Sequence, residues 1–142
     1  MPDNTTNQQA IQTHLQITQS VIQRMASNSA SCKAWCIALV SAVLVIVATT
    51  EKAQYTLIAI IPIVLFLVLD TYYLTLEKMF IQSYNSFIEK LHTGKVATSD
   101  LYIVSPSGSM LRGFFASFIS FSIWPFYLTL LVMTFVTKLI VF

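Results

Sequence analysis

Three long apolar runs without a charged residue constrain this chain more than any other feature of its sequence. They cover residues 34–50, 53–69 and 113–137, which is 17, 17 and 25 residues. A helix that crosses the apolar core of a bilayer needs roughly 20 residues, within a range of about 17 to 25. Only 10% of the residues are charged, whereas soluble domains carry about 25%. The sequence therefore predicts an all-helical (all-α) integral membrane protein with three transmembrane helices.

The uncharged runs divide the chain into four predicted segments. Residues 1–33 form a polar N-terminal segment with an amphipathic cytoplasmic helix, and residues 34–76 form a two-span transmembrane hairpin. Residues 77–112 form a cytoplasmic helix extension with a loop, and residues 113–142 form the third transmembrane helix. The connection at residues 51–54 is so short that the first two spans are expected to run antiparallel.

The N-terminal segment carries apolar residues at helical spacing. Ile11, Leu15, Ile22 and Met25 form a near-heptad stripe, which indicates a helix over about residues 8–29. Four glutamines lie on another face of this helix: Gln12, Gln16, Gln19 and Gln23. We expect a solvent-facing polar surface there. The alternative is a polar lining inside an oligomer, with the side chains of His14 and Arg24 near the same lumen.

After the second span, no helix-breaking residue appears before Gly94, so one helix is expected from about Tyr55 to His92. At about 1.5 Å per residue its length is on the order of 57 Å, while the apolar core of a bilayer is about 30 Å thick. The far half of this helix therefore stands in the cytoplasm. It carries an apolar seam of Tyr73, Leu76, Phe80, Tyr84, Phe87 and Leu91. Covering this seam requires the N-terminal helix, a neighbouring subunit or both, which favours a homo-oligomer.

The basic residues indicate how the spans are oriented. Arg24 and Lys33 precede the first span, and Lys78, Lys90, Lys95 and Arg112 lie between the second and third. The opposite side has only Lys52 and Lys138. Because cytoplasmic loops carry the excess of Lys and Arg, we expect the N-terminus in the cytoplasm and the C-terminus in the periplasm.

No pattern in the sequence predicts catalysis, a metal site or a cofactor. The chain has no phosphate-binding glycine loop, no Cys-x-x-Cys pair and no His-x-x-x-His pair. Cys32 and Cys36 are interpreted as free thiols that pack at the membrane boundary. His14 and His92 are expected at the surface or at an interface. The sequence thus argues against an enzyme.

Asp70 is the carboxylate that ends the second uncharged run. A charge inside the bilayer is costly unless it reaches water, a cation or the interior of a helical bundle. Two interpretations follow: a hydrated acid that extends to the interface, or a ring of carboxylates at the mouth of a pore that attracts cations.

Prolines and small residues inside the spans are the remaining candidates for a pore or gate. Pro62 and Pro125 each remove a backbone hydrogen bond, which predicts a static kink or, alternatively, a hinge. Gly113, Ser117 and Ser120 form a small-residue stripe that favours close helix packing, with pore lining as the alternative.

In a homo-oligomer, each basic residue on the cytoplasmic side becomes a belt of positive charge. The residues concerned are Arg24, Lys33, Lys78, Lys90, Lys95 and Arg112, with Tyr84 available to stack on a base. Such belts suit the phosphates of a nucleotide or a short nucleic acid, although anionic lipid headgroups match them equally well.

In the loop after Gly94, residues 101–104 are expected to form a short helical turn or an extended piece that packs on the bundle.

The order of these features resembles the SLATT-type membrane effectors that accompany bacterial nucleotide-signalling defence systems. The resemblance covers the layout of residues 10–92, and the stretches Ile-Gln-Arg-Met-Ala at 22–26 and Lys-Ala-Trp-Cys at 33–36 are similar to small membrane proteins of such operons. The membrane effectors of Hailong anti-phage systems are the nearest in layout. The third span departs from the simplest plan, which has two spans.

The resemblance implies a pore in the bacterial inner membrane that disrupts its integrity or potential during abortive infection. It also implies control by a nucleotide or a short single-stranded DNA from a partner nucleotidyltransferase, and a homo-oligomer with a tetramer as the first expectation. Two alternatives stay open: a membrane anchor or accessory subunit for a soluble partner, and a holin-like toxin that needs no ligand.

Overall fold

Residues 4–141 are described in the computed structural model of the chain, and these residues form helices and no strand. In chain order the elements are α1 (Asn4–Thr50), the 3-10 helix η1 (Ala53–Ala59), α2 (Ile60–His92), the 3-10 helix η2 (Thr98–Asp100), α3 (Met110–Phe118) and α4 (Trp124–Val141). The all-helical prediction is confirmed.

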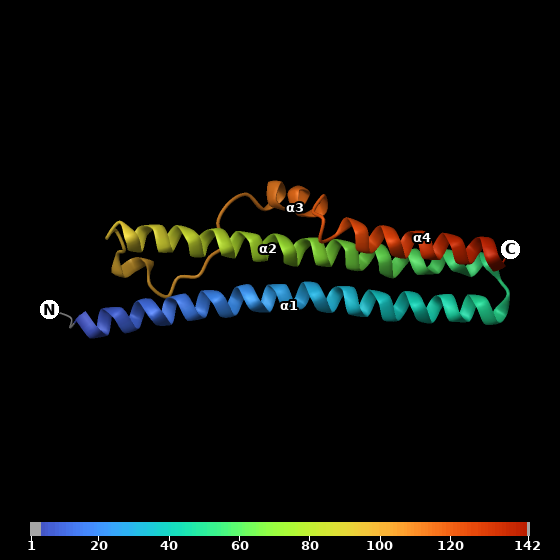
Figure 1. Cartoon of the computed structure of the whole chain (residues 1–142), viewed down its shortest axis with the longest axis horizontal. Helices are drawn as coiled ribbons and strands as arrows, with labels where there is room; N and C mark the ends of the chain where they lie inside the picture. The colour runs from blue at the N-terminus through green and yellow to red at the C-terminus, as the bar shows by residue number, and fades with distance from the viewer. Residues whose placement is uncertain (1–3, 142) are drawn as a thin grey trace.

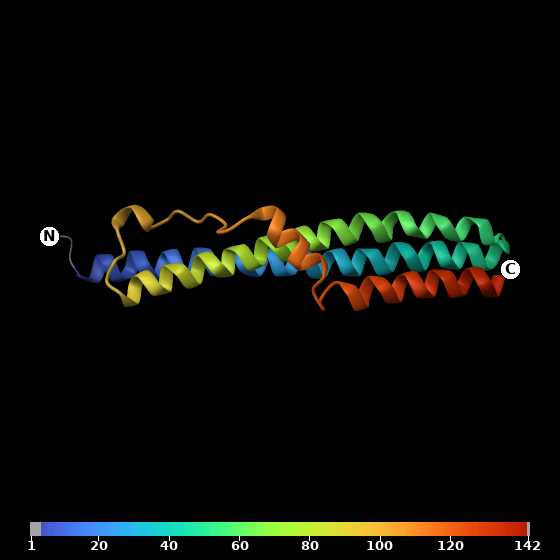
Figure 2. The same cartoon turned by 90° about the horizontal axis from the view of Figure 1, so that it is seen from above.

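The molecule is a long rod (Figure 1). Helices α1 and α2 lie side by side and antiparallel over most of its length, and α4 joins them along one half. The C-terminus and the connection between α1 and η1 lie at the same end, opposite the N-terminus (Figures 1 and 2). The predicted antiparallel hairpin is therefore confirmed.

Helix α1 joins two segments that the sequence analysis treated as separate. Its 47 residues contain neither glycine nor proline, so nothing in the chain interrupts it at the predicted boundary at residue 33. It ends at Glu51, whose φ of 54° leaves the helical region. At about 1.5 Å per residue the helix is roughly 70 Å long, so one rigid element connects the polar and the apolar half of the rod.

The predicted helix from Tyr55 to His92 begins with the 3-10 segment η1 and continues as α2. Pro62 lies in the first turn of α2, directly after η1. A helix leaves the first backbone N–H groups without intrahelical acceptors, so proline costs little at this place. Pro62 therefore lies at the change from 3-10 to α geometry rather than in the interior of a regular α-helix, and the predicted kink or hinge stays a prediction.

The predicted third span, residues 113–137, is not one helix. It is divided between α3 and α4, and residues 119–123 form turns between them. The backbone N–H groups of Ser120 and Ile123 donate to the carbonyls of Ser117 and Ser120. Pro125 lies in the first turn of α4, where proline favours a helix start rather than a kink. Helix α4 has 18 residues, about 27 Å, which is close to the thickness of a bilayer core of about 30 Å.

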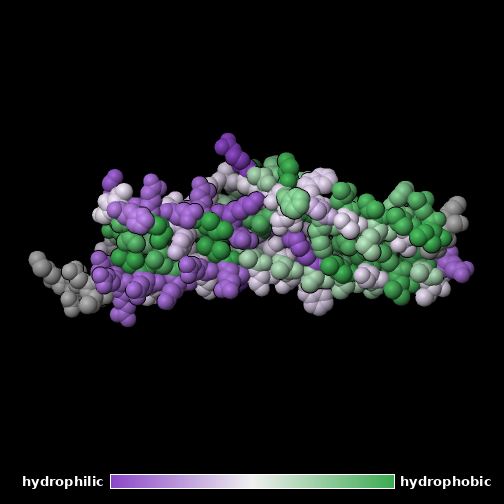
Figure 3. Space-filling model, in the orientation of Figure 1, coloured by the Kyte–Doolittle hydropathy of each residue, from purple (hydrophilic) through white to green (hydrophobic). Residues whose placement is uncertain are grey.

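The two halves of the rod differ in polarity. Figure 3 shows hydrophobic residues over the half that holds α4 and hydrophilic residues over much of the other half. Segments Asn7–Thr50 and Gln54–His92 are long and apolar enough to cross a membrane, and Trp124–Ile140 is a shorter apolar helix. The structure thus has two long apolar helices that could span a membrane.

The core of the apolar half lies where α1, α2 and α4 meet. It contains Cys36, Val40, Ala59, Ile63, Leu74, Ile123, Tyr127 and Leu130. Many large side chains on the outside of the same half stay exposed, such as Val45, Ile61 and Phe135, with exposed fractions of 62%, 68% and 61%. An apolar surface of this extent is typical of contact with lipid or with other subunits.

The segment between α2 and α3 packs on the rod, as expected. It contains η2, the buried side chain of Leu101, and an extended stretch in which the N–H of Ser107 donates to the Met79 carbonyl over 3.3 Å. This stretch runs back along α2 and brings α3 to the middle of the molecule (Figure 1).

Candidate functional site

A buried ion pair lies where the apolar half of the rod meets the polar half. The Asp70 side chain, from α2, is completely buried, and its Oδ2 lies 2.5 Å from Nζ of Lys33 on α1. The Ser29 hydroxyl donates to Oδ1 of the same carboxylate, and the Tyr127 hydroxyl, from α4, donates to Oδ2 over 3.2 Å. Three helices therefore meet at one carboxylate.

Helical spacing places the partners of Asp70. Ser29 and Lys33 are one turn apart on the same face of α1, and Nζ of Lys33 is 3.4 Å from Oγ of Ser29. The Tyr127 hydroxyl also lies 3.0 Å from the carbonyl oxygen of Phe66, one turn before Asp70 on α2. Tyr127 thus fixes the beginning of α4 to the helix that carries the carboxylate.

Further buried side chains surround the ion pair. Cys32 and Cys36 are buried free thiols next to it, and Sγ of Cys36 lies 3.9 Å from the Pro62 carbonyl oxygen. Thr71 and Thr75 are buried on the other side, and each hydroxyl donates to a carbonyl one turn earlier over 2.7 Å. The expectation that the two cysteines pack as free thiols is confirmed.

The geometry of Asp70 differs from the hydrated acid considered in the sequence analysis. Its side chain has no exposed surface, because hydroxyl and ammonium donors replace the water that a carboxylate at the interface would bind. The interpretation as a hydrated interfacial acid was therefore wrong.

The pairing of Lys33 with Asp70 was not predicted, although the sequence contains a signal for it. In an antiparallel hairpin, residues equally far from the turn lie at the same level. Lys33 is 19 residues before Lys52, and Asp70 is 18 residues after it. The same register places Gln19 beside Tyr84, whose hydroxyl oxygen accepts a hydrogen bond from Gln19 over 3.2 Å.

The ion pair is intact in this structure, and separating its partners would be costly. Burying an ion pair is costly unless its geometry and hydrogen bonds are good, and separating the partners leaves an uncompensated charge that needs water. Lys33 is held by α1 while Asp70 is held by α2 and Tyr127 by α4. A displacement of one helix against the others would therefore leave the two charges unpaired at the point where the apolar half meets the polar half.

The predicted phosphate-binding residues are not brought together in one place. Lys33 is engaged by Asp70, and Lys90 forms an ion pair with Asp100 over 2.9 Å. Arg24 and Lys95 are exposed at separate points of the polar half. Lys78 and Arg112 line one cavity of about 310 Å³ together with Ser107, Gly108 and Ser109.

The predicted pore and gate residues also lie apart from one another. Ser117 is buried in α3 against α2, and its hydroxyl finds no hydrogen-bond partner among the described residues. Ser120 lies in the turn before α4, and Pro62 and Pro125 lie at helix starts. A part of the packing prediction is confirmed, because a Cβ atom added to Gly113 would lie 3.0 Å from Cγ2 of Thr75.

His14 occupies a place that the sequence analysis did not predict. It is buried, its ring centroid lies 4.3 Å from that of Phe87, and its Nδ1 accepts a hydrogen bond from the Tyr102 N–H over 3.0 Å. Burial lowers the pKa of His14, while the charge of Asp100 acts in the opposite direction. The expectation of a surface histidine was therefore wrong within this chain.

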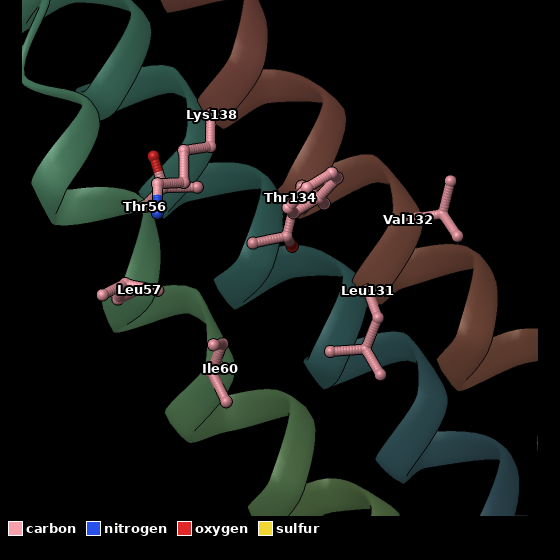
Figure 4. A pocket seen from close by; sticks show the side chains of 8 residues that line it. Thr56, Leu57, Ile60, Leu131, Val132, Thr134 and Lys138 are labelled. Carbon is pink, nitrogen blue, oxygen red and sulfur yellow. The ribbon is translucent and has the colours of Figure 1, made fainter. Parts of the chain in front are cut away.

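A cavity in the apolar half lies between η1, the beginning of α2 and α4. It measures about 450 Å³ and is lined mainly by apolar side chains, with Thr56, Thr134 and Lys138 among them (Figure 4). Its lining is about as apolar as the exposed surface around it and offers few partners to a polar ligand.

Among residues 4–141, no three His, Cys, Asp or Glu side chains come together as ligands for a metal ion. Comparisons with protein-family models, with curated proteins and with solved structures found no match for this chain. The function is therefore inferred from the geometry described above.

Proposed function

We propose that the chain is an oligomeric, pore-forming membrane effector of bacterial anti-phage defence, which disrupts the integrity or potential of the inner membrane. The observation that carries this proposal is the buried Lys33–Asp70 pair between the apolar and the polar half of the rod. Ionisable residues at membrane depth usually mark ion pathways or the elements that control them. In this proposal the pair holds α1 and α2 together while the pore is closed, and we call the Lys33–Asp70 pair the latch.

The continuous helices link this latch to the cytoplasmic half. Helix α1 carries Lys33 and extends as one element to the N-terminal end of the rod, and α2 carries Asp70 and extends to His92. A ligand that shifts the cytoplasmic ends against each other also changes the distance between the two charges. Its effect on the gate equals its difference in affinity between the two states.

The exposed apolar side chains of the membrane half support assembly in the bilayer. In our proposal α1, α2 and α4 cross the membrane, with the N-terminus in the cytoplasm and the C-terminus in the periplasm. Exposed residues on all three helices, such as Val45, Ile61 and Phe135, then contact lipid or neighbouring copies. A tetramer is the first arrangement to test, and the pore would form between subunits.

The ligand in this proposal is a nucleotide or a short single-stranded DNA that is supplied by a partner nucleotidyltransferase. The exposed cations of the polar half, Arg24 and Lys95, support a phosphate-bearing ligand there. The half-buried ring of Tyr84 lies on the same half of α2.

The test combines particle mass with ion flux. The full chain, 15.9 kDa per copy, is purified in detergent, measured by mass photometry and reconstituted into vesicles loaded with a potassium-sensitive dye. We expect a particle of several copies and a potassium flux that changes when a short single-stranded DNA or ATP is added. Single chains without flux would overturn the pore and would favour the membrane anchor.

Variants connect the flux to the latch. Lys33→Met breaks the pair from one side, and we expect it to change the basal flux, while Lys90→Gln removes an exposed cation of the polar half and serves as the matched control. Equal flux in both variants would remove the latch from the mechanism. Flux and killing that no nucleotide or DNA alters would favour the holin-like toxin.

A further inference from the structure

The short helix α3 lies across α2 in the middle of the rod, whereas α1, α2 and α4 run along the rod (Figures 1 and 2). One face of α3 points outward and carries Leu111 and Phe115, and Ile119 continues this face directly after the helix; their exposed fractions are 75%, 65% and 72%. These residues follow one another at a spacing of four, so they form a continuous apolar stripe. A short helix with such a stripe is typical of an element that lies in the plane of a membrane interface.

The other face of α3 is held closely against α2. Gly113 approaches Thr75 so tightly that an added Cβ atom would lie 3.0 Å from Cγ2, and Ser117 is completely buried. Packing of this inner face against α2 therefore fixes the direction in which the apolar stripe points.

A basic cavity opens beside the beginning of α3. Its volume is about 310 Å³, and its lining includes Lys78 and Gln82 from α2 and Ser107, Ser109 and Arg112 from the loop and α3. Among the described residues, neither Lys78 nor Arg112 takes part in a salt bridge, so two cations face the cavity without a carboxylate. Two cations with nearby hydroxyl groups form a suitable environment for a phosphate group.

In the proposed insertion, the end of this cavity nearest Asp70 lies in the headgroup region of a bilayer, and Lys78 lies eight residues, about 12 Å, beyond Asp70. Thr75, which contacts Gly113, lies five residues after Asp70, about 7.5 Å beyond the end of the uncharged run. The headgroup region on each side of the core is of similar depth, about 5 to 7 Å. The exposed ring of Tyr72 lies in the same turns of α2, as expected for a residue at the interface.

We propose that α3 is an interfacial helix and that the adjoining cavity binds the phosphate of an anionic phospholipid. The stripe of Leu111, Phe115 and Ile119 lies in the acyl boundary, while Lys78 and Arg112 contact the headgroup. A lipid supplies the apolar chain and the phosphate together, which matches the direct neighbourhood of Leu111 and Arg112. This inference rests on the membrane insertion proposed above and does not need a pore.

The experiment measures lipid preference. The full chain is placed in nanodiscs that contain phosphatidylcholine alone or a mixture with phosphatidylglycerol, and bound lipids are counted by native mass spectrometry after release. We expect retained phosphatidylglycerol and a loss of retention in Lys78→Gln/Arg112→Gln of at least about fivefold per removed cation. Arg24→Gln/Lys95→Gln removes the same charge from other exposed sites and should retain the lipid.

A second arm separates the lipid from a free phosphate. Inorganic phosphate and ATP are added to the protein in lipid-free detergent, and binding is followed by calorimetry. The lipid site is overturned if the wild type binds either compound without lipid and Lys78→Gln/Arg112→Gln does not. It is also overturned if both double variants retain phosphatidylglycerol equally. Flotation with phosphatidylcholine vesicles reports membrane insertion separately, so failure of the proposed function is distinguished from failure of this site.

A nitroxide probe checks the depth of α3 in the same nanodiscs. It is attached at Phe115→Cys in a chain whose Cys32 and Cys36 are replaced by alanine. We expect the probe to be accessible to oxygen, which dissolves in the acyl region, and shielded from a water-soluble nickel reagent. The opposite accessibility would place the stripe in water and overturn the interfacial helix.

Discussion

The carboxylate of Asp70 and the ammonium group of Lys33 lie 2.5 Å apart inside the rod, on two different helices. Only Lys33 keeps some contact with solvent, since its side chain is 22% exposed whereas that of Asp70 is fully buried. Removing one partner therefore leaves the other charge in a different environment, depending on which partner is removed. A lone Lys33 can extend toward water, but a lone Asp70 keeps its charge in the interior.

This asymmetry predicts unequal effects of the two single substitutions. Lys33→Met leaves the carboxylate without its cation and should lower the free energy of unfolding by about 3 kcal/mol. Asp70→Asn should cost less, because the amide oxygen of the new side chain still accepts a hydrogen bond from Ser29 and Lys33 is free to reach solvent. Thermal unfolding of the purified variants in detergent measures both effects.

The double variant Lys33→Met/Asp70→Asn tests whether the charge itself is responsible. It removes both charges, so it should be more stable than Lys33→Met alone. Lys90→Gln, which breaks the exposed pair with Asp100, should leave the melting temperature nearly unchanged. A double variant that is as unstable as the sum of the two single variants would contradict coupling between these residues.

We expect the hydroxyl of Tyr127 to contribute to the attachment of α4 to α2. Its hydroxyl lies 3.0 Å from the Phe66 carbonyl oxygen and 3.2 Å from Oδ2 of Asp70. Tyr127→Phe keeps the ring in the core but removes this donor, and it should cost about 1 to 3 kcal/mol. Tyr72→Phe changes an exposed ring and is the matched control. Equal melting temperatures for the two variants would show that the hydroxyl of Tyr127 contributes nothing to the attachment of α4.

The close contact between Gly113 of α3 and Thr75 of α2 can be tested with one substitution that crowds it and a second that relieves the crowding. In Gly113→Ala, the new Cβ atom would lie 3.0 Å from Cγ2 of Thr75, and crowding of this kind costs about 1 to 3 kcal/mol. Alanine also favours the helix over glycine by about 0.5 to 1 kcal/mol, so the net loss should be small but measurable.

Thr75→Ser removes the methyl group concerned and retains the hydroxyl that donates to the Thr71 carbonyl. Gly113→Ala/Thr75→Ser should therefore be more stable than Gly113→Ala and should restore the resistance of residues 101–109 to proteolysis. If the serine variant fails to rescue the alanine variant, α3 does not depend on this close approach.

The sequence was sufficient to predict the helical hairpin, because uncharged runs and the absence of glycine and proline act locally. Helix α1 contains neither glycine nor proline, and α2 contains only Pro62 near its start, but the continuity of α1 across residue 33 was not predicted. The break between α3 and α4 was missed, since a run of 25 uncharged residues outweighed the turn chemistry of Ser120 and Ser122. Local hydrogen bonds from serine compete with a helix even in an apolar stretch.

The candidate site was predicted only in part, because it depends on contacts between distant residues. Asp70 was identified as unusual from its place at the end of an apolar run. Its partners Ser29, Lys33 and Tyr127 come from two other helices, and the position of α4 depends on the unpredicted break. His14 was missed for a similar reason, because its partner Tyr102 is supplied by a loop 88 residues away in the chain.

The His14–Tyr102 contact predicts that the loop before α3 loosens in mild acid. Nδ1 of His14 accepts the Tyr102 N–H, so protonation of Nδ1 removes the acceptor. Burial lowers the pKa of His14 in the folded protein below its ordinary value of 6.5, against the opposing charge of Asp100. Asp100 itself is paired with Lys90, and hydrogen bonds from the Ala97 N–H and from Lys90 lower the pKa of Asp100.

Because the folded pKa of His14 lies below the unfolded one, its contribution to stability is complete above pH 6.5 and is lost as the pH falls through the folded pKa. Hydrogen exchange at the Tyr102 amide, corrected for the intrinsic rate, should therefore be slow at neutral pH and faster in mild acid. His14→Phe retains a ring against Phe87 but accepts no hydrogen bond, so its exchange should be fast at every pH. His92→Gln changes an exposed histidine and should behave like the wild type. Protection at Tyr102 that does not vary with pH in the wild type would exclude His14 as the acceptor that holds this loop.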